Sequence, residues 1–240
     1  MKQIYLLLLL PTMLNSFSQT KKDSLQAPFT VSGFVLLINN GISAVPAFSA
    51  GKPAVMTSLT IRKNHFSFTP QFNYILEGRP WSTNSWLRYQ TTKGKFTYRT
   101  GANMSLFFKK NIDQNVEKIG YNQYLETELA VFYQASDRMS INLLFWHDAG
   151  FEKDAVAFGN FVSLSASIFK ISISKGVKLN FSPNIFYTWN AIPFKGLFVS
   201  STANFVFKNS PISLNIQAVE PISADESAKF IWNYGLNWAF

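Results

Sequence analysis

The sequence contains no cysteine and only two histidines among its 240 residues. Without cysteine, the chain has no disulfide bonds, no thiolate metal ligands and no nucleophilic thiol. Charged residues make up only 15% of the sequence, whereas soluble domains average about 25%. No run of 18 or more apolar residues occurs, which excludes a helical membrane protein. The chain is therefore apolar overall but lacks the segments that would cross a membrane as helices.

Hydrophobic residues supply 47% of the sequence and aromatic residues 16%, with 24 phenylalanines. This content excludes a disordered chain, and the absence of a heptad or glycine period excludes coiled coils and collagen. The net charge of +9 would suit nucleic acid, but no nucleic-acid motif accompanies it. We therefore expect no nucleic-acid partner.

The N-terminal segment has the features of a secretory signal peptide. Lys2 precedes an apolar stretch at 4–10, and Ser16 and Ser18 supply the small residues before a cleavage site at Gln19. A membrane anchor is disfavoured because the stretch is too short to span and polar residues follow. We predict a signal peptide at 1–18, a short periplasmic tail at 19–27 and a single transmembrane barrel at 28–240.

Apolar and polar residues alternate with period two along most of the chain. The pattern is clearest at the C-terminus, where one face carries six bulky apolar residues: Phe230, Trp232, Tyr234, Leu236, Trp238 and Phe240. The opposite face is mostly small or polar. No helical pattern is available to cover the apolar face, so lipid is its expected partner.

Twelve such runs are present, and a slip in phase near Ile168 and Phe169 predicts a β-bulge. The runs are 28–38, 54–62, 66–76, 83–91, 95–108, 122–134, 139–147, 158–174, 177–189, 196–207, 212–219 and 229–240. The connections alternate in length, and we expect the longer ones outside the cell: 39–53, 77–82, 109–121, 148–157, 190–195 and 220–228. The sequence thus predicts an all-β fold: a single antiparallel up-and-down transmembrane β-barrel of about 12 strands, with ten as the other possible count.

The signal peptide, the alternating strands and the aromatic closing strand resemble outer-membrane β-barrel proteins of Gram-negative bacteria. Tyr234, Leu236, Trp238 and Phe240 resemble the C-terminal signal that the barrel-assembly machinery reads. The segment PAFSAGKP at 46–53 and the pair Pro80 and Trp81 resemble motifs of a small-barrel family of the Bacteroidota-type envelope. The resemblance implies an outer-membrane location, outer-membrane lipid and lipopolysaccharide as surroundings, and no particular activity.

Four charged residues on consecutive strands have inward parity. Arg88 and Arg99 lie about equally far from the turn at 92–94, which predicts that they face each other across the strand pair. Like charges side by side destabilise a pair, so Glu126 and Glu128 on the next strand are the expected counter-charges. Either a stiffening salt-bridge network or a charged constriction that selects solutes fits this cluster.

The expected inward faces give the lumen a charge balance of +6. The eight cations are Arg62, Arg88, Lys95, Arg99, Lys170, Lys178, Lys208 and Lys229, set against Glu126 and Glu128. Acidic residues gather instead in the expected external connections, Asp148 among them. The simplest interpretation is that these acids are solvated. The second is that they bind divalent ions shared with lipopolysaccharide.

His147 is the one candidate for catalysis. Outer-membrane phospholipase barrels carry a histidine and a serine two residues apart on the outer surface, with a polar residue on the neighbouring strand. Here Ala149 occupies the serine position, so we expect no enzyme. No group of histidines and carboxylates has the spacing of a metal site, and no glycine-rich phosphate loop is present, so no cofactor is expected.

Three functions remain open for such a barrel. Eight strands fill with side chains and sixteen leave an aqueous channel, so at twelve the inward residues decide. We expect a narrow or gated pore for small solutes, anionic ones if it is selective. A closed structural barrel that serves as a subunit or docking partner of an envelope complex is the alternative, and a lipid-modifying barrel enzyme is the third.

Overall fold

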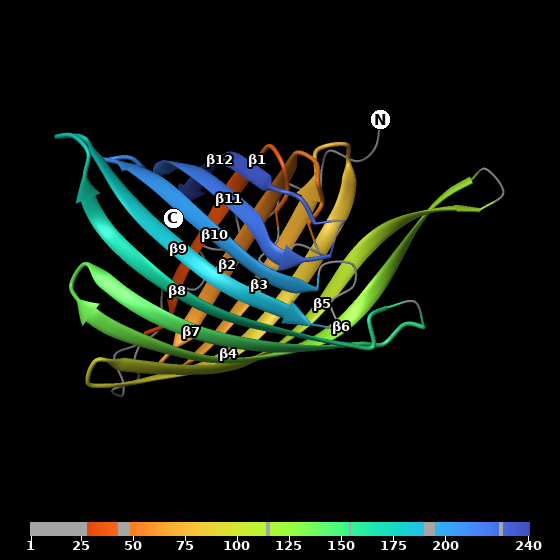
Figure 1. The fold of residues 1–240 in the computed structure, drawn as a ribbon, viewed down its shortest axis with the longest axis horizontal. Helices are drawn as coiled ribbons and strands as arrows, with labels where there is room; N and C mark the ends of the chain where they lie inside the picture. Colours follow the sequence, from red (N-terminus) through yellow and green to blue (C-terminus); the bar gives the residue numbers. More distant parts are fainter. Residues whose placement is uncertain (1–27, 43–48, 114–115, 154, 190–194, 226–227) are drawn as a thin grey trace, which may run out of the picture.

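The structure, a computed structural model, is described here for residues 28–42, 49–113, 116–153, 155–189, 195–225 and 228–240. The predicted signal peptide at 1–18 and tail at 19–27 lie outside the described residues. Twelve strands form one closed antiparallel barrel in which each strand pairs with its neighbours in sequence and β1 pairs with β12 (Figure 1). They are β1 (Thr30–Ile38), β2 (Ala54–Lys63), β3 (Phe66–Ile75), β4 (Arg79–Lys93), β5 (Phe96–Asp113), β6 (Val116–Ser136), β7 (Met139–Gly150), β8 (Phe158–Ser172), β9 (Val177–Trp189), β10 (Gly196–Phe207), β11 (Ile212–Ala224) and β12 (Ile231–Ala239). The predicted fold class and the count of twelve are confirmed.

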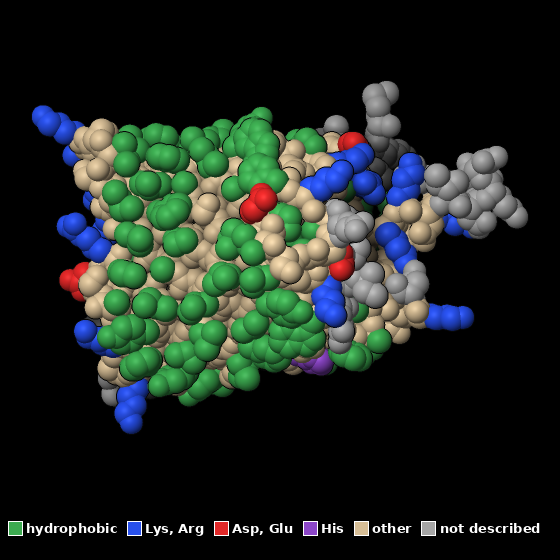
Figure 2. All heavy atoms as spheres, viewed as in Figure 1, with side chains coloured by type: hydrophobic (Ala, Val, Ile, Leu, Met, Phe, Trp, Pro, Cys, Tyr) green, Lys and Arg blue, Asp and Glu red, His purple; other side chains and the backbone are tan. Residues whose placement is uncertain are grey.

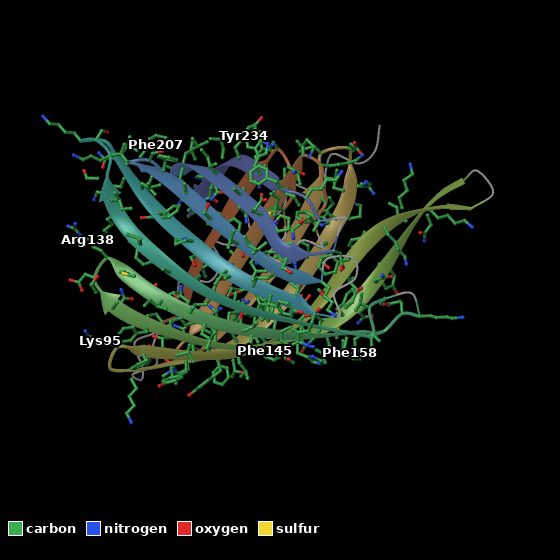
Figure 3. The ribbon with its side chains drawn as sticks, in the orientation of Figure 1. Lys95, Arg138, Phe145, Phe158, Phe207 and Tyr234 are labelled. Carbon is green, nitrogen blue, oxygen red and sulfur yellow. The ribbon has the colours of Figure 1, made fainter. Side chains whose placement is uncertain are left out.

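Alternation places the apolar residues on the outside of the barrel. On β12, Trp232, Tyr234, Leu236 and Trp238 are about half exposed, while Asn233 between them is buried. Figure 2 shows the resulting hydrophobic band, and Phe207 and Tyr234 point away from the barrel in Figure 3. No helix among the described residues is long and apolar enough to cross a membrane. A sheet that exposes its apolar face and closes on itself suits hydrocarbon, because closure leaves no strand edge without hydrogen bonds.

The two ends of the barrel differ in their connections. The turn end, where β2 leads to β3, β4 to β5 and so on, carries a rim of cations (Figure 2). Lys95 and Arg138 mark this rim in Figure 3. The other cations of its turns are Lys63, Lys93, Lys175 and Lys208. The opposite end, which we call the loop end, holds the longest connections, including 39–53 between β1 and β2.

Four predicted loops are shorter than expected because strands continue into them, the fourth being 220–228, where β11 runs on to Ala224. The expected loop 109–121 is a continuation of β5 and β6, which stay paired from Phe108 with Tyr121 to Asp113 with Val116. This hairpin projects beyond the loop end (Figure 1). Strand β4 begins already at Arg79, and β7 runs on to Gly150. The alternation of apolar and polar residues is weaker in these extensions, because strand segments outside the lipid do not need an apolar outer face.

The predicted bulge in β8 is confirmed. The register between β8 and β9 shifts between Ile168 and Ile171. Lys170, within this shift, has a φ of 58°, and its backbone N–H donates to Asn180 Oδ1 at 2.9 Å. The extra residue explains the slip in alternation, because a bulge resets which side chains face the lumen.

The barrel closes between β1 and β12, directly beside the C-terminus. Phe240 and Gly33 exchange backbone hydrogen bonds of 2.9 and 3.0 Å. A Cβ atom built at Gly33 would lie 2.7 Å from the Phe240 ring, so glycine is needed for the ring to lie there. The residues assigned to the assembly signal thus form the outer face of the closing strand.

Candidate functional site: the barrel lumen

Two parts of the lumen wall, formed by strands other than β1 to β3, differ in chemistry. Strands β4 to β6 turn charged side chains inward, and we call them the charged half. Apart from Asp148 near the end of β7, strands β7 to β12 turn mainly serine, threonine and amide side chains inward above their turn-end residues, and we call them the neutral half. Buried polar residues occur in both, for example Glu128 in the charged half and Ser163 in the neutral half.

Glu128 on β6 is the centre of the charged half. Its side chain is fully buried, and Arg88 Nε and Arg99 Nε donate to its Oε1 at 3.0 and 2.7 Å. Second nitrogens of both arginines donate to Oε2 at 3.4 and 3.1 Å, and Trp146 Nε1 adds a bond of 3.0 Å. Both guanidinium groups also lie over aromatic rings, Arg88 on Trp86 and Arg99 on Phe132. One carboxylate on β6 therefore holds side chains from three other strands, β4, β5 and β7.

Gly101 makes this arrangement possible. In the sheet it lies between Arg88 on β4 and Glu128 on β6 and is paired with both. A Cβ atom at this position would lie 2.8 Å from Arg88 Cγ. Because glycine has no side chain, the Arg88 side chain can cross β5 to reach Glu128.

Glu126 has different partners from those expected. Its carboxylate accepts hydrogen bonds from Asn103 Nδ2 at 2.7 Å and Ser105 Oγ at 2.8 Å, both on β5. Asp148 on β7 is paired with it in the register and is also buried. Asp148 was expected in an external loop, but the extension of β7 carries it into the lumen.

The structure places the two arginines differently from the prediction. Arg88 is paired with Gly101 and Arg99 with Gln90, so they are diagonal rather than directly opposite. The lumen charge is also lower. Lys95 and Lys208 lie in turns and Lys229 precedes β12, while Asp148 adds an inward acid, so the balance is less positive than the expected +6. The overestimate arose from extending strand parity into turns, where it does not hold.

The connection between β1 and β2 enters the lumen near the loop end. Ile42 is buried against residues of four strands on the far wall: Phe161, Phe186, Phe198 and Val219. The rings of this wall form a row, with centroids 5.3 Å apart from Phe161 to Phe186 and 5.1 Å from Phe186 to Phe198. Trp146 extends the row at 5.2 Å from Phe161.

The residue before Ile42 contacts the near wall. A Cβ atom at Gly41 would lie 3.2 Å from the Trp81 ring and 3.3 Å from Ala54, which belong to a second buried apolar cluster with Ile38 and Ile75. In the same connection, the Gly41 N–H donates to the Lys52 carbonyl and the Ala50 N–H donates to the Gly41 carbonyl. The two clusters and the Gly41–Ile42 pair together cross the lumen, and we call them the apolar septum.

Two motifs of the sequence meet in this septum. Trp81 of the Pro80–Trp81 pair is buried in it, and Ala50 from the segment 46–53 packs against it. Residues 46–48 lie outside the described part of the chain. The sequence did not indicate why these motifs occur, because they lie far apart in sequence and meet only when the barrel closes.

The neutral half is held together by weaker contacts. Asn142 Nδ2 donates to Ser165 Oγ at 3.2 Å, and Asn184 Nδ2 to Ser200 Oγ at 3.4 Å. Among the described residues, three buried amide oxygens have no hydrogen-bond partner: those of Asn142, Asn184 and Asn204. Buried polar atoms are usually satisfied, so these acceptors mark a wall that can bond with something inside the lumen.

His147 lies on the outer face of β7, where it pairs in the sheet with Thr127 and Asn160. Its Nδ1 is 2.9 Å from Asn160 Oδ1, so a histidine and a polar residue of the neighbouring strand are indeed together. Ala149 stands where a serine would be needed, and the Thr127 hydroxyl donates to the His147 backbone carbonyl at 3.4 Å. Within the described ranges, no group of three histidines and carboxylates could hold a metal ion.

Sequence reasoning missed Ile42, Gly101, Asp148, Phe161 and Phe198. Gly101 carried a signal, since a glycine inside a strand often marks a close approach. Parity could have placed Phe161 and Phe198 inward. Ile42 had no signal, because nothing in a loop sequence shows that it folds back into a barrel.

The chain matches no family model and no curated protein sequence. Solved structures share its fold. The KdgM porin in complex with disordered oligogalacturonate aligns with a TM-score of 0.57 at 10% identity, covering 87% of this chain and 99% of that chain. The COG4313 outer membrane channel from Pseudomonas putida F1 gives 0.52 at 12% identity over 92% and 99%, and the NanC porin 0.50 at 10% over 88% and 99%. At these identities the likeness concerns the fold.

Proposed function

We propose that the protein is a narrow, gated pore for small solutes in the outer membrane of a Gram-negative cell. One observation carries the proposal: the lumen of the barrel is lined by polar side chains and is interrupted by one apolar septum that belongs partly to a connection. The shared fold with outer-membrane porins and channels supports the location and the role.

The septum acts as the gate in this proposal. Hydrophobic constrictions close pores by excluding water. Since Gly41 and Ile42 belong to a connection and not to the barrel wall, their displacement opens the lumen without breaking a strand pair. Three inward acids offset part of the inward positive charge, so the lumen favours anions only weakly and charge selects less here than the septum does.

Planar-bilayer recording of the purified protein tests the pore. Ile42→Ser should raise the open probability strongly, because a hydroxyl among Phe161, Phe186 and Phe198 weakens the seal. The matched control is Ile216→Ser, an exposed outward residue on β11, which should leave the open probability unchanged. No conductance from either wild type or Ile42→Ser would refute the pore.

The projecting hairpin of β5 and β6 favours one other function. Its paired strands reach past the barrel, with Ile119 and Tyr121 exposed. Such an extension would suit docking in an envelope complex, with the barrel as a structural subunit. Pull-down with and without residues 110–119 tests this role, and loss of a co-purifying envelope protein on deletion would support it. We also propose that the protein is not an enzyme and that the barrel-assembly machinery inserts it. We further propose that it belongs to a Bacteroidota-type cell envelope.

A further inference from the structure

A cavity of about 250 Å³ lies inside the barrel against the neutral half. It adjoins the apolar septum, because Phe161, Phe186 and Val219 border both. Trp146 and Leu144 complete its apolar side. The remaining lining consists of hydroxyl and amide side chains from four strands, including Ser163, Asn184, Ser200, Thr202 and Gln217. None of the lining residues that the structure describes carries a charge.

The polar lining leaves hydrogen-bond acceptors open. Asn184 uses its amide N–H on Ser200 Oγ at 3.4 Å, and its buried Oδ1 has no partner among the described residues. Asn142 repeats the arrangement next to the cavity, with its N–H groups near Ser165 and Ser167 and its Oδ1 unpartnered. A buried acceptor without a donor is costly, so a solute that supplies O–H donors gains free energy here.

The aromatic side of the cavity favours solutes that present apolar C–H groups. Trp146 keeps its indole N–H on Glu128, so the ring and not the polar edge is left for the cavity. Phe161 and Phe186 offer apolar surface beside it. A charged solute would lose its hydration without meeting an opposite charge in this lining. Polyhydroxylated solutes combine O–H donors with apolar C–H faces and carry no charge.

We infer that this cavity binds a neutral polyhydroxylated solute of about the size of a monosaccharide, and that such solutes are what the pore passes. The cavity volume agrees with a solute of this size, because pockets for larger, drug-sized ligands begin at about 300 Å³. The claim that such solutes pass through the pore rests on the proposed function. Binding itself follows from the cavity alone.

Calorimetric titration of the folded, detergent-solubilised barrel with D-glucose tests the binding. Gluconate and glucosamine have the same carbon skeleton with a negative or positive charge, and we expect both to bind at least about tenfold more weakly than glucose. Equal binding of gluconate and glucose would overturn the neutral preference. Absence of saturable glucose binding by the folded barrel would overturn the site.

Asn184→Leu removes the open acceptor and should weaken glucose binding about tenfold or more. Asn237→Leu is the matched control, because Asn237 Nδ2 also donates to a serine at 3.4 Å but does not line the cavity. Equal losses in the two variants would contradict the assignment. If Asn184→Leu does not fold, Thr202→Val tests the same wall, since it replaces a lining hydroxyl by a methyl group.

Binding and conductance separate the two proposals. Glucose binding without conductance in Ile42→Ser would retain the site and refute the pore. Conductance without saturable binding would retain the pore and refute the site. In an open pore, glucose should also reduce the ion current in wild type and Asn237→Leu more than in Asn184→Leu.

Discussion

The charged and neutral halves of the lumen wall differ in how their buried polar side chains are hydrogen-bonded. Both must hold polar side chains away from bulk water. In the charged half, the Glu128 carboxylate receives five hydrogen bonds, four of them from two guanidinium groups. In the neutral half, serine and asparagine side chains meet at 3.2–3.5 Å and leave amide oxygens open. The comparison teaches that the charged half is saturated and braces the wall, whereas the neutral half retains capacity to bind.

The largest effect should come from the seam where the neutral half closes on β1. Replacing Trp238 and Phe240 by Ser should abolish the folded barrel, since Phe240 packs on Gly33 and the outer face of β12 loses the two aromatic residues nearest the C-terminus. The readout is heat-modifiable electrophoretic mobility in outer-membrane fractions. Phe207→Ser, on the exposed end of β10, is the control and should assemble normally. Normal yield of the double variant would show that this strand is not an assembly signal.

Glu128→Gln should destabilise the charged half by about 3–5 kcal/mol, less where water enters, because two guanidinium groups lose their buried counter-charge. Glu126→Gln should cost only about 1–2 kcal/mol, since its partners are a neutral amide and a hydroxyl. Urea unfolding in detergent measures both. Adding Arg99→Met to Glu128→Gln should recover part of the loss, and strict additivity of the two changes would contradict a shared network.

Gly101→Val should cost about 1–3 kcal/mol, because the new side chain occupies the path of Arg88 across β5. Gly176→Ala is the control, since a Cβ atom there meets nothing within 4 Å. Thermal unfolding of the two variants separates a local clash from a general effect of losing glycine. An equal shift in both would disprove the role of Gly101.

Asn142→Leu in the neutral half should change the free energy of unfolding by less than about 1 kcal/mol. The substitution removes two long hydrogen bonds but also an unsatisfied buried oxygen, and these effects oppose each other. Urea unfolding checks the value against Glu128→Gln. A loss as large as that of Glu128→Gln would remove the distinction between the halves.

The smallest effect concerns pH at the loop end. Lys52 donates to both oxygens of Glu77 at 2.7 Å, which holds the pKa of that carboxyl below its ordinary value. The lowered pKa adds stability above the unfolded-state pKa of about 4.3, and this stability is lost as pH falls through the folded-state value. Since Lys52 also bonds through its backbone to Gly41, acid should raise the open probability slightly. Glu77→Gln should abolish that change, and an unaltered pH response would contradict the link.

Period-two alternation predicted an antiparallel barrel of about twelve strands, with ten as the other possible count, and it predicted most of the side chains that face inward. This works because every strand must place apolar residues in lipid, so each run carries its own complete signal. The bulge at Ile168 was readable for the same reason, since one extra residue reverses the phase. Arg88, Arg99 and Glu128 were identifiable as inward neighbours from parity and turn position.

Only the closed barrel decided which inward residues meet. Trp146 reaches Glu128 because β7 continues the row that runs from Arg88 through Gly101, and the sequence contains no mark of that row. Ile42 belongs to the same buried apolar cluster as Phe198, which lies 156 positions further along the chain. Strand parity is a local property, because the alternation within one segment is enough to assign it. Contacts across a lumen depend on strand stagger and on where a loop folds, and these follow from the packing of the whole barrel.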